Sequence, residues 1–235
     1  MTPIPAPSPN QEPRPPGTRI DLLILHYTGM ATGAEALTRL RDPTARVSAH
    51  YLIEEDGRIL ALVPEAQRAW HAGVAAWAGA RDINDRSLGI ELVNPGHDGG
   101  YRPFPEAQMA ALESLAAAIA ARHAIPPARV LGHSDVAPTR KRDPGELFDW
   151  PRLARAGLGL WPDPARPVPT EDASAAALHA ALTRLGYDAE APPDAVLLAF
   201  QRHFQPERLG RPGDRETLRR VLSLLEQLET GPRVG

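Results

Sequence analysis

The sequence predicts an α/β fold, with a mixed central β-sheet flanked by helices, followed by a small all-α three-helix bundle. Three observations support this fold class. In the first two thirds of the chain, short apolar runs alternate with amphipathic stretches, as in sheets covered by helices. An Asp-Gly pair between two such runs indicates a hairpin, so the strands do not all run parallel. Beyond residue 170, apolar residues recur only at helical spacing.

Five stretches are predicted to be strands of the sheet. They are residues 20–27, 48–54, 58–63, 87–93 and 129–132. The first, IDLLILHY, is continuously apolar up to its histidine and rich in branched side chains, which favours a buried strand. The second and third flank Asp56-Gly57, a pair typical of two-residue hairpin turns. The fourth, SLGIELV, carries a single acid among apolar neighbours.

Apolar residues at helical spacing predict two helices in the sheet domain and three in the bundle. They cover residues 34–41 and 105–123, and then 171–185, 194–203 and 214–228. Pro126-Pro127 ends the second helix, because proline cannot continue a helical hydrogen-bond ladder. Thr170 and Asp214 are predicted N-caps of the first and third bundle helices.

These elements divide the chain into four parts. Residues 1–17 form a proline-rich arm that we expect to lie extended along the surface, and residues 18–162 form the sheet domain. Residues 163–169 (DPARPVP) are the predicted linker, and residues 170–230 the helical domain. Three short amphipathic helices bury little core of their own.

Composition excludes several classes of partner and site. The 235 residues carry a formal net charge of −3, which gives no electrostatic reason to expect nucleic acid or an anionic membrane as partner. The absence of cysteine excludes disulfides and thiolate metal ligands. No apolar run is long enough for a transmembrane helix. The start of the chain does not read as a secretory signal, so we expect a cytoplasmic protein. Nothing in the sequence suggests an obligate dimer, so we expect a monomer. A periplasmic or outer-membrane-associated protein is the alternative if a signal was removed.

The segment GHSDVAPTRKRDPG carries the strongest indication of chemistry. It places His133 and Asp143 in a proline-interrupted stretch that cannot be helical throughout. Imidazole and carboxylate are ligands that zinc accepts, and a catalytic zinc site needs three protein ligands and an open position. His26, at the end of the first strand, is the predicted third ligand. Read singly, a histidine at a strand end is more often a structural residue.

Glu91 and Lys141 are the predicted catalytic side chains. A lone glutamate in an apolar strand is costly to bury without a partner or a task, so Glu91 is the candidate base for an attacking water. Lys141 can place an ammonium against a developing oxyanion. The alternatives are that Glu91 pairs with Arg86, and that Lys141 belongs to a solvated basic cluster.

Five motifs in order resemble one enzyme family. They are LHYTG (25–29), SAHYLIEEDG (48–57), AWHAG (69–73), SLGIELVN (87–94) and the segment 132–145. Together they resemble the zinc-dependent N-acetylmuramoyl-L-alanine amidases of the amidase-2 family, which are related to peptidoglycan recognition proteins. The resemblance covers roughly residues 8–161.

The resemblance implies one Zn2+ per chain, held by His26, His133 and Asp143. It also implies Glu91 as the catalytic acid and Lys141 as the residue that stabilises the transition state. The implied reaction is hydrolysis of the amide between N-acetylmuramic acid and L-alanine, in peptidoglycan or in smaller anhydro-muropeptides. A non-catalytic peptidoglycan receptor and a zinc peptidase acting on stem peptides are the alternatives.

The same motifs suggest side chains that contact substrate. The turn containing Trp70 and His71 resembles a segment that lines the substrate cleft, although His71 is nearly as well explained as a packed loop residue. Asn94, just beyond the catalytic strand, is placed to hydrogen-bond the peptide.

The last third of the chain resembles the small three-helix peptidoglycan-binding domain. ALTRLGYDAE (181–190) and AVLLAFQRHF (195–204) carry this likeness, mostly through their core spacing. Residues 191–193 (APP) replace the polar, glycine-containing turn that such modules usually have. Cell-wall binding and a purely structural role both stay open for this module.

Overall fold

Six strands form the central sheet of the computed structural model, which describes residues 2–170 and 172–230. Its strands are β1 (Ile4–Pro5), β3 (Leu22–Tyr27), β4 (Tyr51–Ile53), β5 (Ile59–Ala61), β9 (Ser87–Leu92) and β10 (Val130–Gly132). Their order is β1-β5-β4-β9-β3-β10. β4 and β5 pair antiparallel through the predicted hairpin, whereas β4, β9, β3 and β10 run parallel. The mixed sheet is therefore confirmed.

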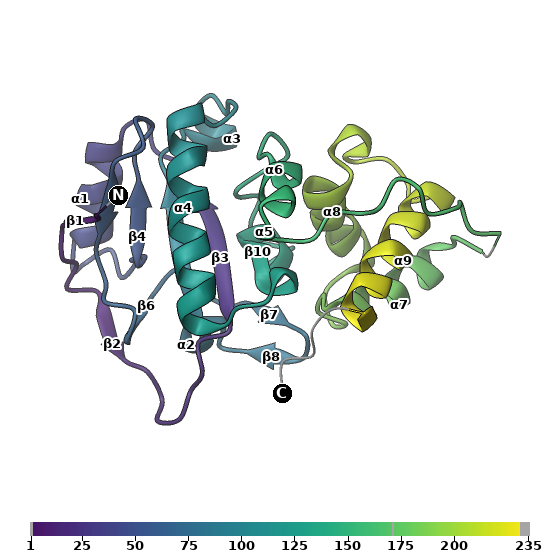
Figure 1. Ribbon diagram of the computed structural model, residues 1–235, viewed down its shortest axis with the longest axis horizontal. Helices are drawn as coiled ribbons and strands as arrows, with labels where there is room; N and C mark the ends of the chain where they lie inside the picture. The colour runs from purple at the N-terminus through teal and green to yellow at the C-terminus, as the bar shows by residue number, and fades with distance from the viewer. Residues whose placement is uncertain (1, 171, 231–235) are drawn as a thin grey trace.

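Helices cover both faces of this sheet (Figure 1). α4 (Glu106–His123) packs Leu112 and Ile119 against Leu23 and Leu25, which point to one face of β3. α1 (Gly33–Arg41) packs on the strands at the β1 side through a separate cluster that includes Leu40. Thr32 begins α1 with a capping box, in which its hydroxyl accepts the backbone N–H of Glu35.

The proline-rich arm, residues 1–17 in the prediction, pairs with strands of the sheet domain. β1 pairs in parallel with β5, and β2 (Gln11–Pro13) pairs antiparallel with β6 (Gln67–Ala69). Ser8 and Asn10 lie between these strands and are buried. The Asn10 amide donates to the carbonyl of Val47 at 2.8 Å. The arm is extended as expected, but it forms an edge strand because it donates and accepts ladder hydrogen bonds.

The C-terminal bundle consists of α7 (Ala175–Leu185), α8 (Pro193–Phe204) and α9 (Arg215–Thr230). Ser174, and not Thr170, caps α7, and the predicted first residue of this helix, Glu171, lies outside the described residues. Asp214 caps α9 as predicted, because its carboxylate accepts the backbone N–H of Thr217 at 2.9 Å.

The bundle packs beside β10 and shares one apolar core with the sheet domain (Figure 1). Leu182 and Phe200 of the bundle belong to the same buried cluster as Ile24 and Leu131 of the sheet. The linker residues 163–169 also pack on α9, where Arg166 pairs with Glu226 at 2.9 Å. The two predicted domains are therefore joined by a continuous interface.

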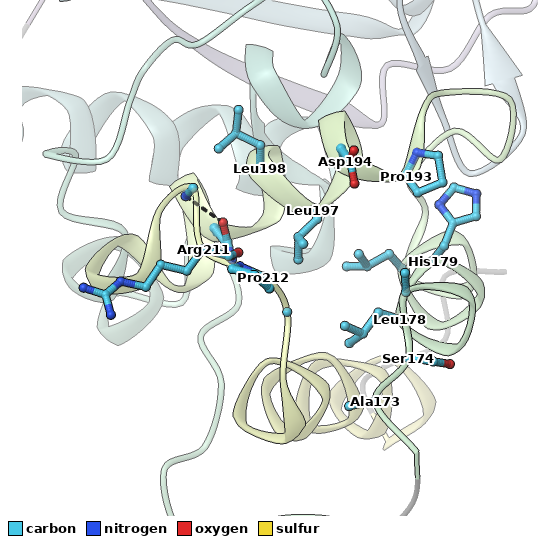
Figure 2. A pocket seen from close by; sticks show the side chains of 15 residues that line it. Ala173, Ser174, Leu178, His179, Pro193, Asp194, Leu197, Leu198, Arg211 and Pro212 are labelled. Atoms are coloured by element: carbon cyan, nitrogen blue, oxygen red, sulfur yellow. Dashed lines mark hydrogen bonds between the residues drawn. The ribbon is translucent and has the colours of Figure 1, made fainter.

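A cavity of about 660 Å³ lies within the bundle. Figure 2 shows Leu178 from α7 and Leu197 from α8 projecting into it, with His179 and Asp194 near its rim. None of the predicted site residues lines this cavity, so it is separate from the chemistry described below.

Shorter elements complete the described chain. They are β7 (Ala76–Trp77), β8 (Ala80–Arg81), α2 (Ile83–Arg86), α3 (Gly96–Gly99), the 3-10 turns η1 (Pro127–Arg129) and η2 (Pro206–Arg208), α5 (His133–Val136) and α6 (Trp150–Arg155). Within the described ranges, no helix has the length and apolar character needed to cross a bilayer.

Candidate functional site

Three neighbouring parallel strands bring the site residues to the same edge of the sheet. In the register of β3 and β9, His26 lies directly opposite Glu91. On the other side of β3, Gly132 of β10 pairs with Leu25, so His133 follows at the level of His26. Carboxyl ends of adjacent parallel strands meet at one edge, which is where open α/β sheets place their ligands.

The turn after β10 carries the two remaining predicted metal ligands. His133 begins α5, and the chain then loops back so that the backbone N–H of Ser134 donates to the carbonyl of Asp143 at 2.9 Å. The carboxylate of Asp135 accepts the backbone N–H of Gly132 at 2.7 Å. These two hydrogen bonds fix the positions of His133 and Asp143, although nine residues separate them in the sequence.

The three predicted ligand atoms converge on one point. His26 Nδ1 lies 2.9 Å from His133 Nδ1 and 3.1 Å from Asp143 Oδ2, and His133 Nδ1 lies 3.0 Å from the same carboxylate oxygen. All three side chains are buried. Ligands of a tetrahedral zinc ion at 2.0–2.1 Å stand roughly 3.3 Å apart, so this spacing suits a single small cation.

The protonation of the cluster also suits a cation. Burial and the neighbouring His133 lower the pKa of His26 to about 4, so this imidazole is neutral at pH 7. Burial alone would raise the pKa of Asp143, but its contacts with His133 and His26 lower it below the ordinary value. His133 Nε2 lies 3.0 Å from the carbonyl of Ala72, to which it donates, so Nδ1 is the nitrogen of His133 that remains for a metal. Acceptors facing one another at this distance repel unless a cation lies between them.

Glu91 is aligned with this cluster and is not used in a structural ion pair. The alternative partner, Arg86, pairs with Asp21 at 2.7 Å instead. Glu91 Oε2 is buried without a hydrogen-bond partner among the described residues. Burial and the Asp143 carboxylate raise the pKa of Glu91 well above its ordinary value, whereas Lys141 lowers it. The side chain lines a cavity of about 270 Å³ next to α1.

Lys141 contributes to the electrostatics of the same groups. Its positive charge lowers the pKa of both His26 and Glu91. The side chain is half-buried. The neighbouring Arg140 takes a different position, where its guanidinium donates to the carbonyl of Ala72 at 3.0 Å.

The three predicted substrate contacts differ in their surroundings. Trp70 is half-buried, and its indole N–H donates to Glu12 of the arm at 3.0 Å, so a role in substrate binding stays a prediction. His71 and Asn94 are both buried, and the contacts of each are to other residues of the protein. His71 is buried against His26, at 3.0 Å from His26 Nε2. Asn94 is fully buried, and its amide is occupied by Arg102 and Gly96 within its own loop.

The bundle contacts the metal-ligand turn directly, which sequence reasoning missed. Asp135, two residues after His133, is fully buried. Its carboxylate accepts the Tyr187 hydroxyl and lies 2.7 Å from His203 Nδ1, in addition to its bond to Gly132. The His203 ring stacks between Trp150 and Phe204. No local pattern in the sequence links these residues, because 52 positions separate Asp135 from Tyr187.

Comparisons with known proteins agree with this geometry. Residues 16–146 match the family Amidase_2, described as N-acetylmuramoyl-L-alanine amidase. The amidase AmiD of Escherichia coli is 40% identical, over 89% of this chain and 83% of that protein. The 1,6-anhydro-N-acetylmuramyl-L-alanine amidase AmpD of Salmonella typhimurium is 38% identical, over 63% of this chain and 86% of that protein.

Solved structures show the same fold. A structure of E. coli AmiD in complex with a substrate superimposes with a TM-score of 0.82 and 39% identity, and it covers 91% of this chain and 92% of the AmiD chain. AmpDh3 of Pseudomonas aeruginosa superimposes with a TM-score of 0.81 and 35% identity, covering 92% and 95%. The likeness includes the C-terminal helices, and both the sequence and the arrangement of the site place this chain in the N-acetylmuramoyl-L-alanine amidase family.

Proposed function

We propose that this protein is a zinc amidase that releases L-alanine-terminated peptides from anhydro-muropeptides. The observation that carries the proposal is the convergence of His26, His133 and Asp143 within 3.1 Å, with Glu91 in register beside them. Two imidazoles and one carboxylate are a donor set typical of catalytic zinc. Zn2+ held there would supply Lewis acidity to the scissile carbonyl and to the attacking water.

The side chains of the protein then move and stabilise charge. Glu91 takes a proton from the attacking water as the new C–O bond forms, and it returns that proton to the nitrogen as the C–N bond breaks. A carboxyl whose pKa is raised by burial suits both steps, because its pKa lies nearer the working pH. The Lys141 ammonium stabilises the oxyanion that develops on the carbonyl oxygen.

The choice of substrate rests on the relatives. AmiD was solved with anhydro-N-acetylmuramic acid-L-Ala-D-gamma-Glu-L-Lys, and AmpDh3 with anhydromuramic pentapeptide. Both proteins match this chain over more than nine tenths of its length. We therefore expect anhydro-muropeptides to be cleaved.

The test is a product analysis with purified protein. Anhydro-N-acetylmuramyl-tripeptide should yield anhydro-N-acetylmuramic acid and free tripeptide by mass spectrometry. A chelator should abolish the reaction, and added Zn2+ should restore it. Cleavage between stem-peptide residues would identify a peptidase instead, and binding of the muropeptide without any product would identify a receptor.

For the C-terminal bundle, we propose a structural role in this chain. The support is the contact of Tyr187 and His203 with Asp135, together with the core shared with β3 and β10. A module that serves only to hold cell wall would not need to bury side chains against the turn that carries His133. Removal of these contacts should therefore destabilise the whole protein, as tested below.

A further inference from the structure

A row of buried polar side chains continues from His26 into the interior, away from the metal ligands. His26 Nε2 lies 3.0 Å from His71 Nδ1, and His71 Nε2 lies 3.1 Å from Ser87 Oγ. The Ser87 hydroxyl lies 2.6 Å from the carbonyl of Ile83. Of the four residues, Ile83 and Ser87 are completely buried, and His26 and His71 nearly so.

The direction of each hydrogen bond in this row can be worked out from its inner end, which is the carbonyl of Ile83. A carbonyl oxygen can only accept, so the single Ser87 hydroxyl proton is donated to Ile83. Ser87 Oγ must then accept from His71, which places a proton on His71 Nε2. A neutral His71 has no proton on Nδ1, so this atom accepts from His26 Nε2. His26 therefore carries its one proton on Nε2, and Nδ1 is left as an acceptor that faces Asp143.

We infer that His71 and Ser87 are positioning residues, which hold His26 in the tautomer and orientation needed to bind the metal. The inference rests on the proposed zinc-dependent function and adds to it a chain of residues behind one ligand. A histidine that binds a metal through one ring nitrogen commonly donates the N–H of its other ring nitrogen to a hydrogen-bond acceptor. This hydrogen bond fixes the orientation of the ring and raises its basicity. Here the partner is itself a histidine, so its own tautomer must be fixed by a third group. Ser87 provides that group.

Packing around His71 agrees with this role. His71 is buried, and its ring lies 5.1 Å from the ring of His26 and 5.7 Å from that of His50, measured between centroids. Asn84 accepts the backbone N–H groups of His71 and Ala72 at 3.1 and 2.8 Å, which holds the loop in place. A Cβ on Gly89 of β9 would come within 2.5 Å of the His71 ring. The strand thus leaves room for the imidazole because residue 89 is glycine.

Removing the Ser87 hydroxyl should change the preferred tautomers of His71 and His26. In Ser87→Ala, a proton on His71 Nε2 would be buried without an acceptor, so His71 gains by moving its proton to Nδ1. His26 Nε2 must then accept, and the His26 proton moves to Nδ1, where it faces Asp143. A metal ion must displace that proton to bind. We expect the zinc affinity of Ser87→Ala to fall by about 10- to 100-fold.

Ser48 offers a matched control. It is also completely buried, and its hydroxyl donates to the Asn10 carbonyl and accepts the backbone N–H of Trp70. It contacts none of the imidazoles in these hydrogen bonds. Ser48→Ala therefore removes an equally buried hydroxyl and should leave zinc affinity unchanged even where it lowers stability.

Two measurements on the full chain test the inference. Competition with a chromophoric chelator gives the zinc affinity of wild type, Ser87→Ala and Ser48→Ala. Nitrogen-15 NMR of the imidazoles in metal-free protein reports whether His26 carries its proton on Nε2. We expect an Nε2-protonated His26 in wild type and Ser48→Ala, and a shift toward the Nδ1 form in Ser87→Ala, together with the loss of affinity. Saturating zinc should restore most of the activity of Ser87→Ala.

An Nδ1-protonated His26 in wild type would overturn the inference, as would a Ser87→Ala protein that binds zinc as tightly as wild type. Wild-type protein that binds no zinc at all would overturn the proposed function instead. The two failures are therefore distinguishable.

Discussion

His26 and Glu91 lie directly opposite each other on the adjacent parallel strands β3 and β9. Because paired residues of neighbouring strands point to the same face, a candidate metal ligand and a carboxylate stand side by side. One oxygen of Glu91 is buried and lacks a hydrogen-bond partner among the described residues, which is costly. In the proposed mechanism, this pairing joins metal binding to proton transfer.

Replacing Glu91 by Gln should remove the base and keep the metal. The amide has nearly the same shape but cannot take a proton from water, so we expect kcat to fall by about 10²- to 10⁴-fold. Zinc content, measured by elemental analysis, should equal that of wild type because Glu91 is not among the three converging ligands. Activity close to wild type in Glu91→Gln would rule out the assigned base.

Replacing Asp143 by Ala should remove the metal. The substitution leaves two imidazoles facing an open site, and we expect the purified protein to contain little zinc and to show no turnover. Asp98→Ala is the control, because Asp98 is exposed and pairs with Arg142 at the surface. Full zinc occupancy in Asp143→Ala would show that this carboxylate is not a ligand.

Replacing Lys141 by Met should lower kcat by about 10²- to 10³-fold, because an oxyanion loses its charged partner. The pH profile should also move. Lys141 lowers the pKa of Glu91, and the base acts only when ionised, so without the ammonium the acidic limb of kcat/KM shifts to higher pH. Arg142→Met, which removes an exposed cation from the same turn, should change neither quantity. An unshifted limb in Lys141→Met would place the ammonium away from Glu91.

The metal-free protein should lose stability as the pH falls from about 6.5 to 5. Burial lowers the pKa of His26 to about 4 and that of His50 to about 3 in the folded state. The unfolded chain binds protons on these imidazoles below its own pKa of about 6.5, and the folded chain does not. The stability is thus complete above pH 6.5 and is lost toward lower pH. Each of these two imidazoles should lower the free energy of unfolding at pH 5 by about 2 kcal/mol.

Urea unfolding in the presence of a chelator measures this effect. The free energy of unfolding should be the same at pH 7.5 and 7, and lower at pH 5, before ordinary carboxyl groups begin to titrate. Equal values at pH 7.5 and 5 would mean that the buried imidazoles accept protons without unfolding.

Replacing Tyr187 by Phe should destabilise the sheet domain and the bundle together. Asp135 loses one of its three donors in a fully buried position, at a cost of about 1–3 kcal/mol. Because the bundle shares its core with β3 and β10, thermal unfolding should remain a single transition that moves to lower temperature. A separate early transition of the bundle would contradict the proposed structural role.

Much of the site was predictable from residue types in order. The candidate ligands His26, His133 and Asp143 lie at strand ends or in a proline-containing turn, and Glu91 is the one acid in an apolar strand. These signals are local, because burial of a lone polar residue is visible from its neighbours in the sequence. The helices were also predictable, and α1 and α4 begin and end within one residue of the expected positions.

Contacts between distant segments were not predictable in this way. The arm was expected to lie extended along the surface, and β1 is exposed, but its pairing with β5 was not predicted because strand pairing depends on a partner that is far away in the chain. His71 was expected to contact substrate, and only the packing of its loop beneath β9 places it behind His26. Asn94 forms hydrogen bonds with Arg102 and Gly96 in its own loop.

The sequence by itself determined the fold class, the donor types of the metal site and the family, because these depend on short patterns and on chemistry that each residue carries alone. Tertiary structure decided which imidazole nitrogens face the candidate metal site, where His71 points, and how the bundle supports Asp135. Those properties depend on hydrogen bonds between residues tens of positions apart, which form only once the chain is folded.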